Sequence, residues 1–287
     1  MITLADFRRR KEFLICVDSD GCAMDTMDIK HVQCFGPSMV EVWGLERWKE
    51  EVLKRWNEIN LYTITRGINR FKGLAMALEE INRKYCSIDG IDEFVRWTGE
   101  AQELSNSAVK LAWEKAAEGL AYSGGETCFG KALEWSEKVN DGINGLDRDL
   151  KKSFAYVRET LAAANMFADV AVVSSANKGA VIEEWMDCGL LGSVDVLCCQ
   201  EDGSKAFCIS VLKEQGYLPE HMLMIGDAPG DLAAAEKNGI YCYPILVRQE
   251  ELSWKELKET GLLRFQNEVY RDYGEEKKKQ FFENLKI

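Results

Sequence analysis

Short apolar runs that alternate with helix-length segments constrain this 287-residue sequence most strongly. Runs that are apolar at successive positions are typical of strands buried on both faces of a parallel sheet. The segments between the last four runs have helical length, and each ends in a glycine suited to a helix C-terminus. This alternation predicts an α/β fold with a Rossmann-like parallel sheet and helices on both faces. The runs are residues 13–17, 170–173, 194–199, 222–225 and 240–247.

The stretch between the first and second runs has a different pattern. It shows almost no strand signal, and its apolar residues repeat at helical spacing within 45–59 and 109–120. We therefore expect an inserted all-helical domain over residues 25–149, and an α/β core formed by residues 1–24 and 150–287.

Tryptophans and glycines give further expectations for the insertion. Six of the eight tryptophans lie in it, and we interpret them as helix-packing residues rather than a cofactor-stacking site. The stretch NDGINGLD at 140–147 is predicted to be the linker back to the core. The side chains expected on two buried helical faces are Leu45, Trp48, Val52, Trp56 and Ile59, and Val109, Ala112, Trp113, Ala116 and Leu120.

The formal net charge of −12 argues against binding to nucleic acid or to an anionic membrane, because both need a cationic protein face. A small anionic ligand needs only a few local cations or a bound metal. No apolar stretch is long enough to cross a bilayer, and the run behind the N-terminal RRRK is too short for a signal peptide. A cytoplasmic location is expected.

The residues available for chemistry are mainly carboxylates. His31 and His221 are the only histidines, too few for a His-rich zinc site, and they leave few candidates for a Ser-His-Asp triad. The ten cysteines are scattered without a CxxC pair, and several lie inside apolar runs. We interpret them as reduced, small apolar side chains.

Aspartates follow two of the predicted strands, at the edge where the carboxyl ends of parallel strands meet. Asp18 and Asp20 come directly after the first run, and Asp227 and Asp231 follow the fourth. Carboxylates gathered there would be oxygen ligands for a hard cation such as Mg²⁺. The structural alternative is that Asp20 begins an ordinary turn with Gly21, and that Asp231 caps the next helix.

Two other connections carry groups that can contact phosphate. Ser174 and Ser175, followed by Asn177, enter a helix after the second run, where hydroxyl and backbone N–H groups can bind an anion. Lys205 lies at the start of the helix after the third run, where a cation is unfavourable unless an anion is near. An N-cap serine and a surface lysine are the alternatives. Four such coincidences, in order after four successive strands, favour a functional interpretation.

This ordered set resembles the haloacid dehalogenase superfamily, which carries DxDG after the first strand, Ser or Thr after the second, Lys before the next strand and GDxxxD after the fourth. The matching residues are DSDG at 18–21, Ser174, Lys205 and GDAPGD at 226–231. The resemblance covers the α/β portion, somewhat over half of the chain. The insertion resembles the helical cap of the phosphoglycolate phosphatase and β-phosphoglucomutase relatives. Cys22 departs from the pattern, because the family usually has Thr there and a thiol is a weaker hydrogen-bond partner.

The resemblance implies a Mg²⁺-dependent phosphatase that hydrolyses a small phosphorylated metabolite. Asp18 would be the nucleophile that forms an aspartyl phosphate, and Asp20 would be the general acid and base. Magnesium would be held by Asp18, the main-chain oxygen of Asp20 and Asp227, with Asp231 as a supporting or alternative ligand.

The resemblance also implies which residues hold the substrate. Ser174 and Lys205 would hold the transferring phosphoryl group, with Ser175 and Asn177 as further substrate contacts. Lys178 is a second candidate for the lysine, but Lys205 lies beyond the third strand, as the family pattern requires.

Substrate choice is expected to come from the helical insertion. The stretch TRGINRFKG at 65–73 places Arg66 and Arg70 in a break between helices, and arginine forks suit carboxylate or phosphate groups. An ordinary solvated loop with surface arginines is the alternative.

Other functions fit parts of this pattern. A mutase or another phosphotransferase would share every core residue. A carbon–halogen dehalogenase would not need Asp20, and a receiver-type signalling module would have neither the large insertion nor GDxxxD. A non-catalytic protein that binds a phosphorylated metabolite is a further alternative. The retained set of motif residues favours an enzyme over this non-catalytic alternative.

Overall fold

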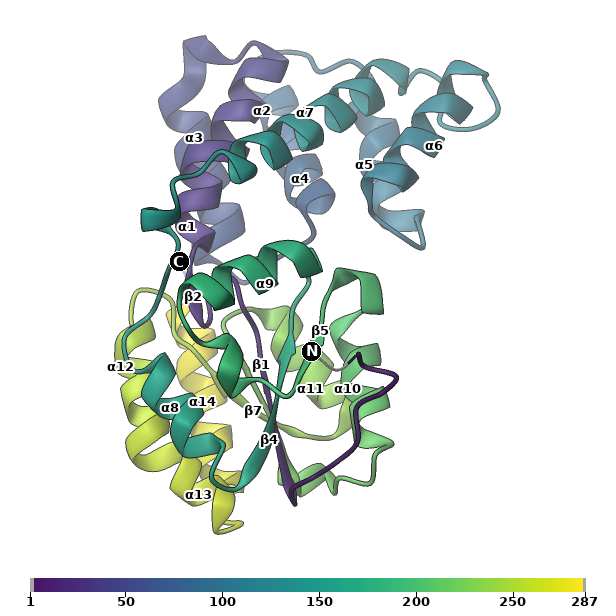
Figure 1. Cartoon of the computed structure of the whole chain (residues 1–287). Helices are drawn as coiled ribbons and strands as arrows, with labels where there is room; N and C mark the ends of the chain where they lie inside the picture. The colour runs from purple at the N-terminus through teal and green to yellow at the C-terminus, as the bar shows by residue number, and fades with distance from the viewer. Residues whose placement is uncertain (1–2, 286–287) are drawn as a thin grey trace. The chain divides into compact units, whose positions relative to one another are not determined.

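The computed structural model describes residues 3–285, and the chain divides into two units (Figure 1). One unit is α/β and comprises Met1–Met27 and Arg148–Ile287. The other is helical and comprises Asp28–Asp147. The two units are called the α/β unit and the helical unit below.

A five-stranded parallel sheet forms the centre of the α/β unit, in the order β5-β4-β1-β6-β7. This confirms the predicted Rossmann-like sheet. The chain builds outward from β1 to β5, then crosses back and builds β6 and β7 on the other side of β1. The carboxyl ends of β1 and β6 therefore lie side by side where the strand order reverses, which is where ligands bind in open α/β sheets. The strands are β1 Phe13–Val17, β4 Ala168–Val173, β5 Val196–Cys198, β6 Met222–Gly226 and β7 Tyr241–Pro244.

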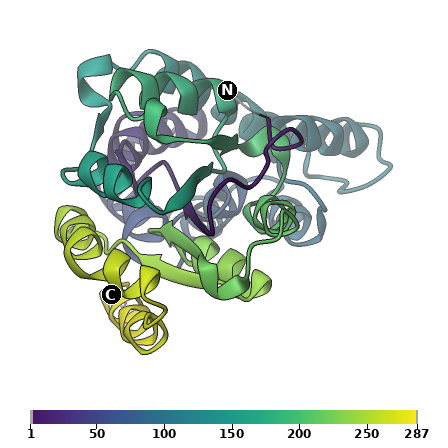
Figure 2. The ribbon, with the colours of Figure 1, turned by 60° about the horizontal axis from the view of Figure 1, so that its bottom comes forward.

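Helices cover both faces of this sheet (Figure 2). Alternate strand residues such as Ile15, Val172 and Ile225 share one buried cluster with Leu161 and Trp185. Helices α8, α9, α12, α13 and α14 contribute to that cluster, whereas α10 and α11 contact the strands without joining it. The helices are α8 Val157–Ala164, α9 Lys178–Asp187, α10 Lys205–Lys213, α11 Pro229–Asn238, α12 Glu250–Glu256, α13 Leu262–Gln266 and α14 Arg271–Asn284.

Local capping residues fix where the helices near the sheet edge begin and end. The Asn177 side chain accepts the backbone N–H groups of the first turn of α9, and the Ser204 hydroxyl accepts one from the first turn of α10. Gly239 ends α11 in the left-handed conformation, with φ of 68°. These caps place Lys205 in the first turn of α10.

The segments that leave and re-enter the α/β unit pair with each other. β2 Met24–Asp25 and β3 Lys152–Ser153 form a two-stranded antiparallel ribbon, and the Phe154 N–H donates to the Ala23 carbonyl. The helical segment is therefore inserted between two paired strands.

The helical unit has its own core, in which Trp56, Trp97 and Trp135 are almost fully buried. The second predicted buried face is partly wrong: Trp113 is 40% exposed and Leu120 is 72% exposed. The reason is that α6 ends before Leu120, and Trp113 lies at the edge of the apolar stripe. The helices are α1 Met27–Lys30, α2 Gly36–Trp43, α3 Lys49–Asn57, α4 Arg70–Lys84, α5 Ile91–Glu100, α6 Asn106–Ala117 and α7 Glu126–Asn144.

The predicted linker at 140–147 is also partly wrong, because α7 continues to Asn144. Gly142 lies inside this helix, and a Cβ atom there would be 3.2 Å from the Cys34 Sγ atom. The glycine allows close packing of α7 against Cys34 and does not break the helix. The return connection therefore begins at Gly145.

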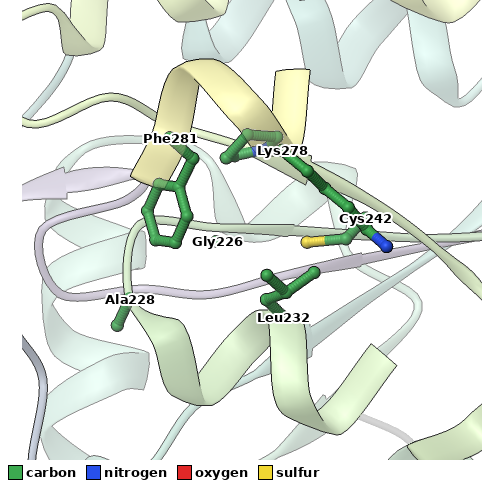
Figure 3. A pocket seen from close by; sticks show the side chains of 7 residues that line it. Gly226, Ala228, Leu232, Cys242, Lys278 and Phe281 are labelled. Atoms are coloured by element: carbon green, nitrogen blue, oxygen red, sulfur yellow. The ribbon is translucent and has the colours of Figure 1, made fainter. Parts of the chain in front are cut away.

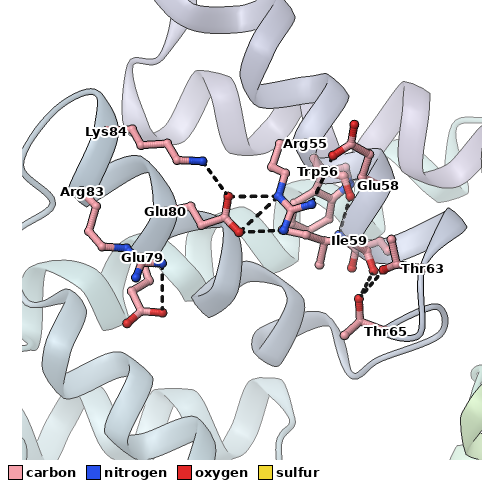
Figure 4. Close-up of polar contacts among 11 residues, drawn as sticks. Arg55, Trp56, Glu58, Ile59, Thr63, Thr65, Glu79, Glu80, Arg83 and Lys84 are labelled. Atoms are coloured by element: carbon pink, nitrogen blue, oxygen red, sulfur yellow. Dashed lines mark hydrogen bonds and ion pairs between the residues drawn. The ribbon is translucent and has the colours of Figure 1, made fainter. Parts of the chain in front are cut away.

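An ion-pair network joins α3 to α4 in the helical unit (Figure 4). The guanidinium of Arg55 bonds to both carboxylate oxygens of Glu80, at 2.8 and 2.9 Å, and also contacts Glu58. Lys84 reaches Glu80 from the next turn. Hydrogen bonding from Arg55 lowers the pKa of Glu80. Since the Arg55 side chain is 42% exposed, each pair adds only about 0–1 kcal/mol, and its main effect is to fix the register of the two helices.

None of the helices within residues 3–285 combines the length and apolar character that crossing a membrane requires.

Candidate active site

Three buried carboxylates meet at the carboxyl edge of the sheet. Asp18 follows β1 and is held by its N–H, which donates to the Ile225 carbonyl at 2.9 Å. Asp227 follows β6, and Asp231 lies in the first turn of α11. One oxygen from each carboxylate lies within 4.8 Å of the others, and the three residues are 1–6% exposed.

Gly226 makes room for the Asp231 side chain. A Cβ atom at Gly226 would lie 2.3 Å from both Cβ and Cγ of Asp231 and 2.4 Å from its Oδ2. Because Asp231 turns back against β6, its Oδ2 accepts the Ala228 N–H at 3.1 Å. The glycine of the GDAPGD motif is thus required by close approach and not by its backbone dihedrals.

Lys205 is the cation of this cluster. Its Nζ lies 2.8 Å from Asp18 Oδ2 and 2.6 Å from Asp231 Oδ1. Burial alone would lower the pKa of Lys205, but the attraction of both carboxylates outweighs burial and holds that pKa above its ordinary value. The other candidate, Lys178, pairs with Asp202 at 3.1 Å. The structure therefore brings Lys205 to Asp18 and gives Lys178 a different partner.

The electrostatics of the cluster suit a divalent cation. Burial raises the pKa of Asp18 well above its usual range, Asp231 and Asp227 raise it further, and Lys205 opposes them. With all three carboxylates ionised, the single ammonium would leave two negative charges in a buried site, which is unfavourable. The donor set consists of oxygens, as hard cations prefer. Asp18, Asp227 and Asp231 therefore fit a bound Mg²⁺.

Asp20 lies outside this cluster of three carboxylates. Its Oδ1 accepts a hydrogen bond from the Thr26 hydroxyl, and the residue is partly exposed. Gly21, with φ of 78°, forms the turn directly after Asp20. Asp18 thus contacts the Lys205 ammonium, whereas Asp20 has a separate hydroxyl partner. Thr26 had no signal in the sequence, because no spacing rule links it to Asp20.

The predicted phosphate contacts after β4 differ in exposure. Ser174 is buried, and its Oγ accepts the Ala176 N–H at 3.1 Å, whereas Ser175 is exposed. Asn177, rather than either serine, is the N-cap of α9. Its side-chain amide donates to Glu201 at 2.7 Å. Contact of these residues with substrate stays a prediction.

Arg66 and Arg70 have partners inside the helical unit. The Arg66 guanidinium donates to the Leu61 carbonyl at 2.7 Å, and the residue is only 2% exposed. Arg70 donates to Ser136 Oγ at 3.0 Å and to Asn140 Oδ1 at 2.8 Å. Burial lowers the pKa of Arg70. The alternative of solvated surface arginines is therefore wrong, and their contact with substrate stays a prediction.

Cys22, which stands where the family pattern usually has threonine, makes a weak hydrogen bond through its thiol. Its Sγ lies 3.6 Å from the Ile225 carbonyl, within range for a thiol donor. The thiol is fully buried, and burial raises its pKa well above the ordinary value. Cys22 is therefore a neutral, packed side chain beside the carboxylates.

A small apolar hollow lies behind Gly226, between α11 and α14 (Figure 3). Phe281 and Lys278 approach it from α14, opposite Ala228 and Leu232. It has no room for a water-sized molecule. It is a packing defect of the core and not a ligand site.

A parallel sheet that gathers buried carboxylates and a lysine at its switch point defines the class: a Rossmann-like α/β protein with an acidic site whose oxygen donors fit a divalent cation. Residues 107–245 match the family model described as haloacid dehalogenase-like hydrolase. Over this segment the chain is similar to haloacid dehalogenase-like hydrolases. The matched segment contains Ser174, Lys205, Asp227 and Asp231 but begins after Asp18.

Comparisons with whole proteins are weaker. None of the curated proteins matches the chain. Similar solved structures include a haloacid dehalogenase-like family hydrolase from Streptococcus pneumoniae, at 12% identity and a TM-score of 0.47, covering 85% of this chain and 90% of that one. A protein from Thermotoga maritima, provisionally named a β-phosphoglucomutase, has 15% identity and a TM-score of 0.49, covering 86% and 99%. One from Lactobacillus delbrueckii subsp. bulgaricus, provisionally named a phosphoglycolate phosphatase, has 13% and 0.49, covering 81% and 85%. Neither activity nor substrate follows from similarities of this size.

Proposed function

We propose that this protein is a Mg²⁺-dependent phosphatase that cleaves a small phosphomonoester through an aspartyl-phosphate intermediate. The observation that carries the proposal is the position of Asp18. It lies at the end of the central strand, buried 2.8 Å from the Lys205 ammonium, beside Asp227 and Asp231. A carboxylate that only capped a segment would not need this set of partners.

The first step would be attack of an Asp18 carboxylate oxygen on phosphorus. A bond from Asp18 to phosphorus forms as the bond to the leaving oxygen breaks, and Asp20 gives that oxygen a proton. In the second step Asp20 takes a proton from water, the water oxygen attacks phosphorus, and the bond to Asp18 breaks. Phosphate leaves and both carboxyl groups return to their starting states.

The partners of the two aspartates suit these different tasks. Lys205 favours the ionised, nucleophilic form of Asp18 against the effect of burial. Thr26 would orient the Asp20 carboxyl group, which is partly exposed and can exchange protons with water. Ser174 would donate to a phosphoryl oxygen.

Asp18, Asp227 and Asp231 would hold the metal ion, with the main-chain oxygen of Asp20 as a further ligand. A bound divalent cation supplies positive charge that offsets the repulsion between carboxylates and phosphate.

The helical unit, residues 28–147, would act as the cap that selects the substrate. Arg66 and Arg70 are its candidate cationic contacts, and Ser175 and Asn177 are those of the α/β unit. The expected ligand is a small phosphorylated metabolite.

The test is release of inorganic phosphate from an aryl phosphate and from a panel of phosphorylated metabolites, with Mg²⁺ and with a chelator. We expect Mg²⁺-dependent release that Asp18→Asn abolishes. Asp195→Asn is the matched control, because Asp195 is an acidic residue of the same unit that precedes β5 at the opposite edge of the sheet and pairs with Arg10.

Two results would contradict the proposal. One is the absence of phosphate release from every compound tested, and the other is full activity in the Asp18→Asn variant. Transfer of phosphate to an acceptor sugar, without free phosphate, would instead indicate the phosphotransferase alternative.

A further inference from the structure

Two buried tryptophans bond to the loop that carries Asp18 and Asp20. Trp185, on α9, donates its indole N–H to the Ser19 hydroxyl oxygen at 2.9 Å. Trp254, on α12, donates its indole N–H to the Cys22 carbonyl at 2.8 Å. All four residues have no exposed surface. The loop is thus fixed by donors that lie 166 and 232 residues away in the sequence.

The loop itself is a tight turn. The Ser19 carbonyl accepts the N–H groups of Cys22, Ala23 and Met24, and the Gly21 N–H donates to the Met24 carbonyl. These bonds fix the shape of the turn but not its position on the sheet. The two indoles supply positional contacts, one next to Asp18 and one two residues after Asp20. An indole has only two side-chain torsions, so a buried one is a rigid donor.

Trp185 also links the loop to the next part of the site. Helix α9 begins after Ser174 and its cap Asn177, and Trp185 lies two turns further along the same helix. The bond to Ser19 therefore sets the distance between the nucleophile and the segment that would contact the phosphoryl group. Within residues 3–285, the indole N–H groups of these tryptophans donate to Ser19 and Cys22 and not to the carboxylate cluster.

We infer that Trp185 and Trp254 are positioning residues that hold Asp18 and Asp20 in the positions that the reaction requires. This inference rests on the proposed phosphatase function. It goes beyond simple core packing, because the indole N–H groups, and not only the ring volumes, are required. Misplacement of a reacting group by about 1 Å can reduce a rate by about 100-fold.

The experiment compares Trp185→Phe, Trp254→Phe, Ser19→Ala and the Trp185→Phe, Ser19→Ala double variant with wild type. Tyr270→Phe is the matched control: its hydroxyl donates to the Cys242 carbonyl at 3.0 Å, is buried in the same unit, and does not touch the loop. For each protein kcat and KM are measured on an aryl phosphate. The thermal midpoint is measured without and with Mg²⁺.

We expect kcat to fall by about tenfold or more in each loop-contact variant, with KM within about twofold of wild type. Because Trp185 and Ser19 act through one bond, the double variant should be no slower than the slower single variant. The rise in thermal midpoint on adding Mg²⁺ should shrink in both tryptophan variants. Tyr270→Phe should lower the thermal midpoint and leave kcat unchanged.

The inference is overturned if the tryptophan variants lower only the thermal midpoint and keep wild-type kcat and Mg²⁺ response. It is also overturned if the kcat losses of Trp185→Phe and Ser19→Ala multiply in the double variant. Failure of the proposed function is a separate result, since wild type would then release no phosphate. The Mg²⁺-induced rise in thermal midpoint would still test the two tryptophans.

Discussion

Substitution of Gly226 by alanine should disable the site through a single steric contact. The added Cβ would lie 2.3 Å from Cβ and Cγ of Asp231, whereas ordinary contacts begin near 3.4 Å. Both neighbours are held: Gly226 is the last residue of a central strand, and Asp231 lies in the first turn of α11. One of them must shift by about 1 Å, because a packed core cannot absorb the overlap otherwise.

The shift of Asp231 has a calculable consequence for its partners. The Lys205 Nζ to Asp231 Oδ1 distance of 2.6 Å would lengthen beyond hydrogen-bond range, and the Ala228 N–H bond at 3.1 Å would be lost. Overpacking of this kind destabilises by about 1–3 kcal/mol. Misplacement by about 1 Å reduces the rate by about 100-fold. The loss of activity should therefore be much larger than the loss of stability.

The assay measures kcat on an aryl phosphate together with the thermal midpoint. Gly230→Ala is the matched control in the same motif, since a Cβ there meets no atom within 4 Å. The control should retain activity, and its thermal midpoint should be unchanged or slightly raised because alanine favours a helix. Wild-type activity in Gly226→Ala would refute the argument, as would an equal loss of activity in Gly230→Ala.

Two further predictions concern charge. In metal-free protein Asp18→Asn should raise the thermal midpoint at neutral pH, because folding raises the pKa of Asp18 and ionisation therefore destabilises the folded state. The sign is set by proton binding: the stability that protonated Asp18 confers is fully present below its ordinary pKa and is lost as pH rises through the raised folded pKa. Thermal melts in chelator across pH should show a difference from wild type that grows with pH, and a difference that grows towards acid pH would contradict the assignment. The Arg66→Ala, Arg70→Ala double variant should change the ranking of substrates in the metabolite panel. Arg55→Ala, which replaces an exposed arginine of the same unit, should leave that ranking unchanged. An unchanged ranking in the double variant would show that neither arginine contributes to substrate choice.

The parallel sheet, and the carboxylates that could bind a metal ion, could be predicted from the sequence. The strand runs are apolar at successive positions because both faces of the sheet are covered. This local pattern can be recognised in the sequence without knowing the fold. Asp18 and Asp227 could be expected at one edge because the carboxyl ends of parallel strands meet there, and the structure adds that β1 pairs directly with β6. Lys205 could be preferred to Lys178 because its place beyond the third strand matches the pattern of the family that the sequence resembles.

Other features depend on contacts between distant segments, which local patterns do not encode. Gly142 was interpreted as a linker residue because glycine is a local helix breaker, yet it packs against Cys34 within a helix. Arg66 and Arg70 were placed in a loop that binds substrate or is solvated, but carbonyl and side-chain oxygens of the helical unit surround them.

The sequence by itself determined the class of sheet, the order of the motifs and the kinds of group at the site. The tertiary structure alone decided which groups are in contact. The Lys205 ammonium lies between Asp18 and Asp231, the Thr26 hydroxyl bonds to Asp20, and two indoles bond to the loop that carries Asp18 and Asp20. The physical reason is that residue type and spacing set local conformation and which strand ends meet. Hydrogen bonds and ion pairs need positions accurate to a few tenths of an ångström, and only the packed core sets positions that closely.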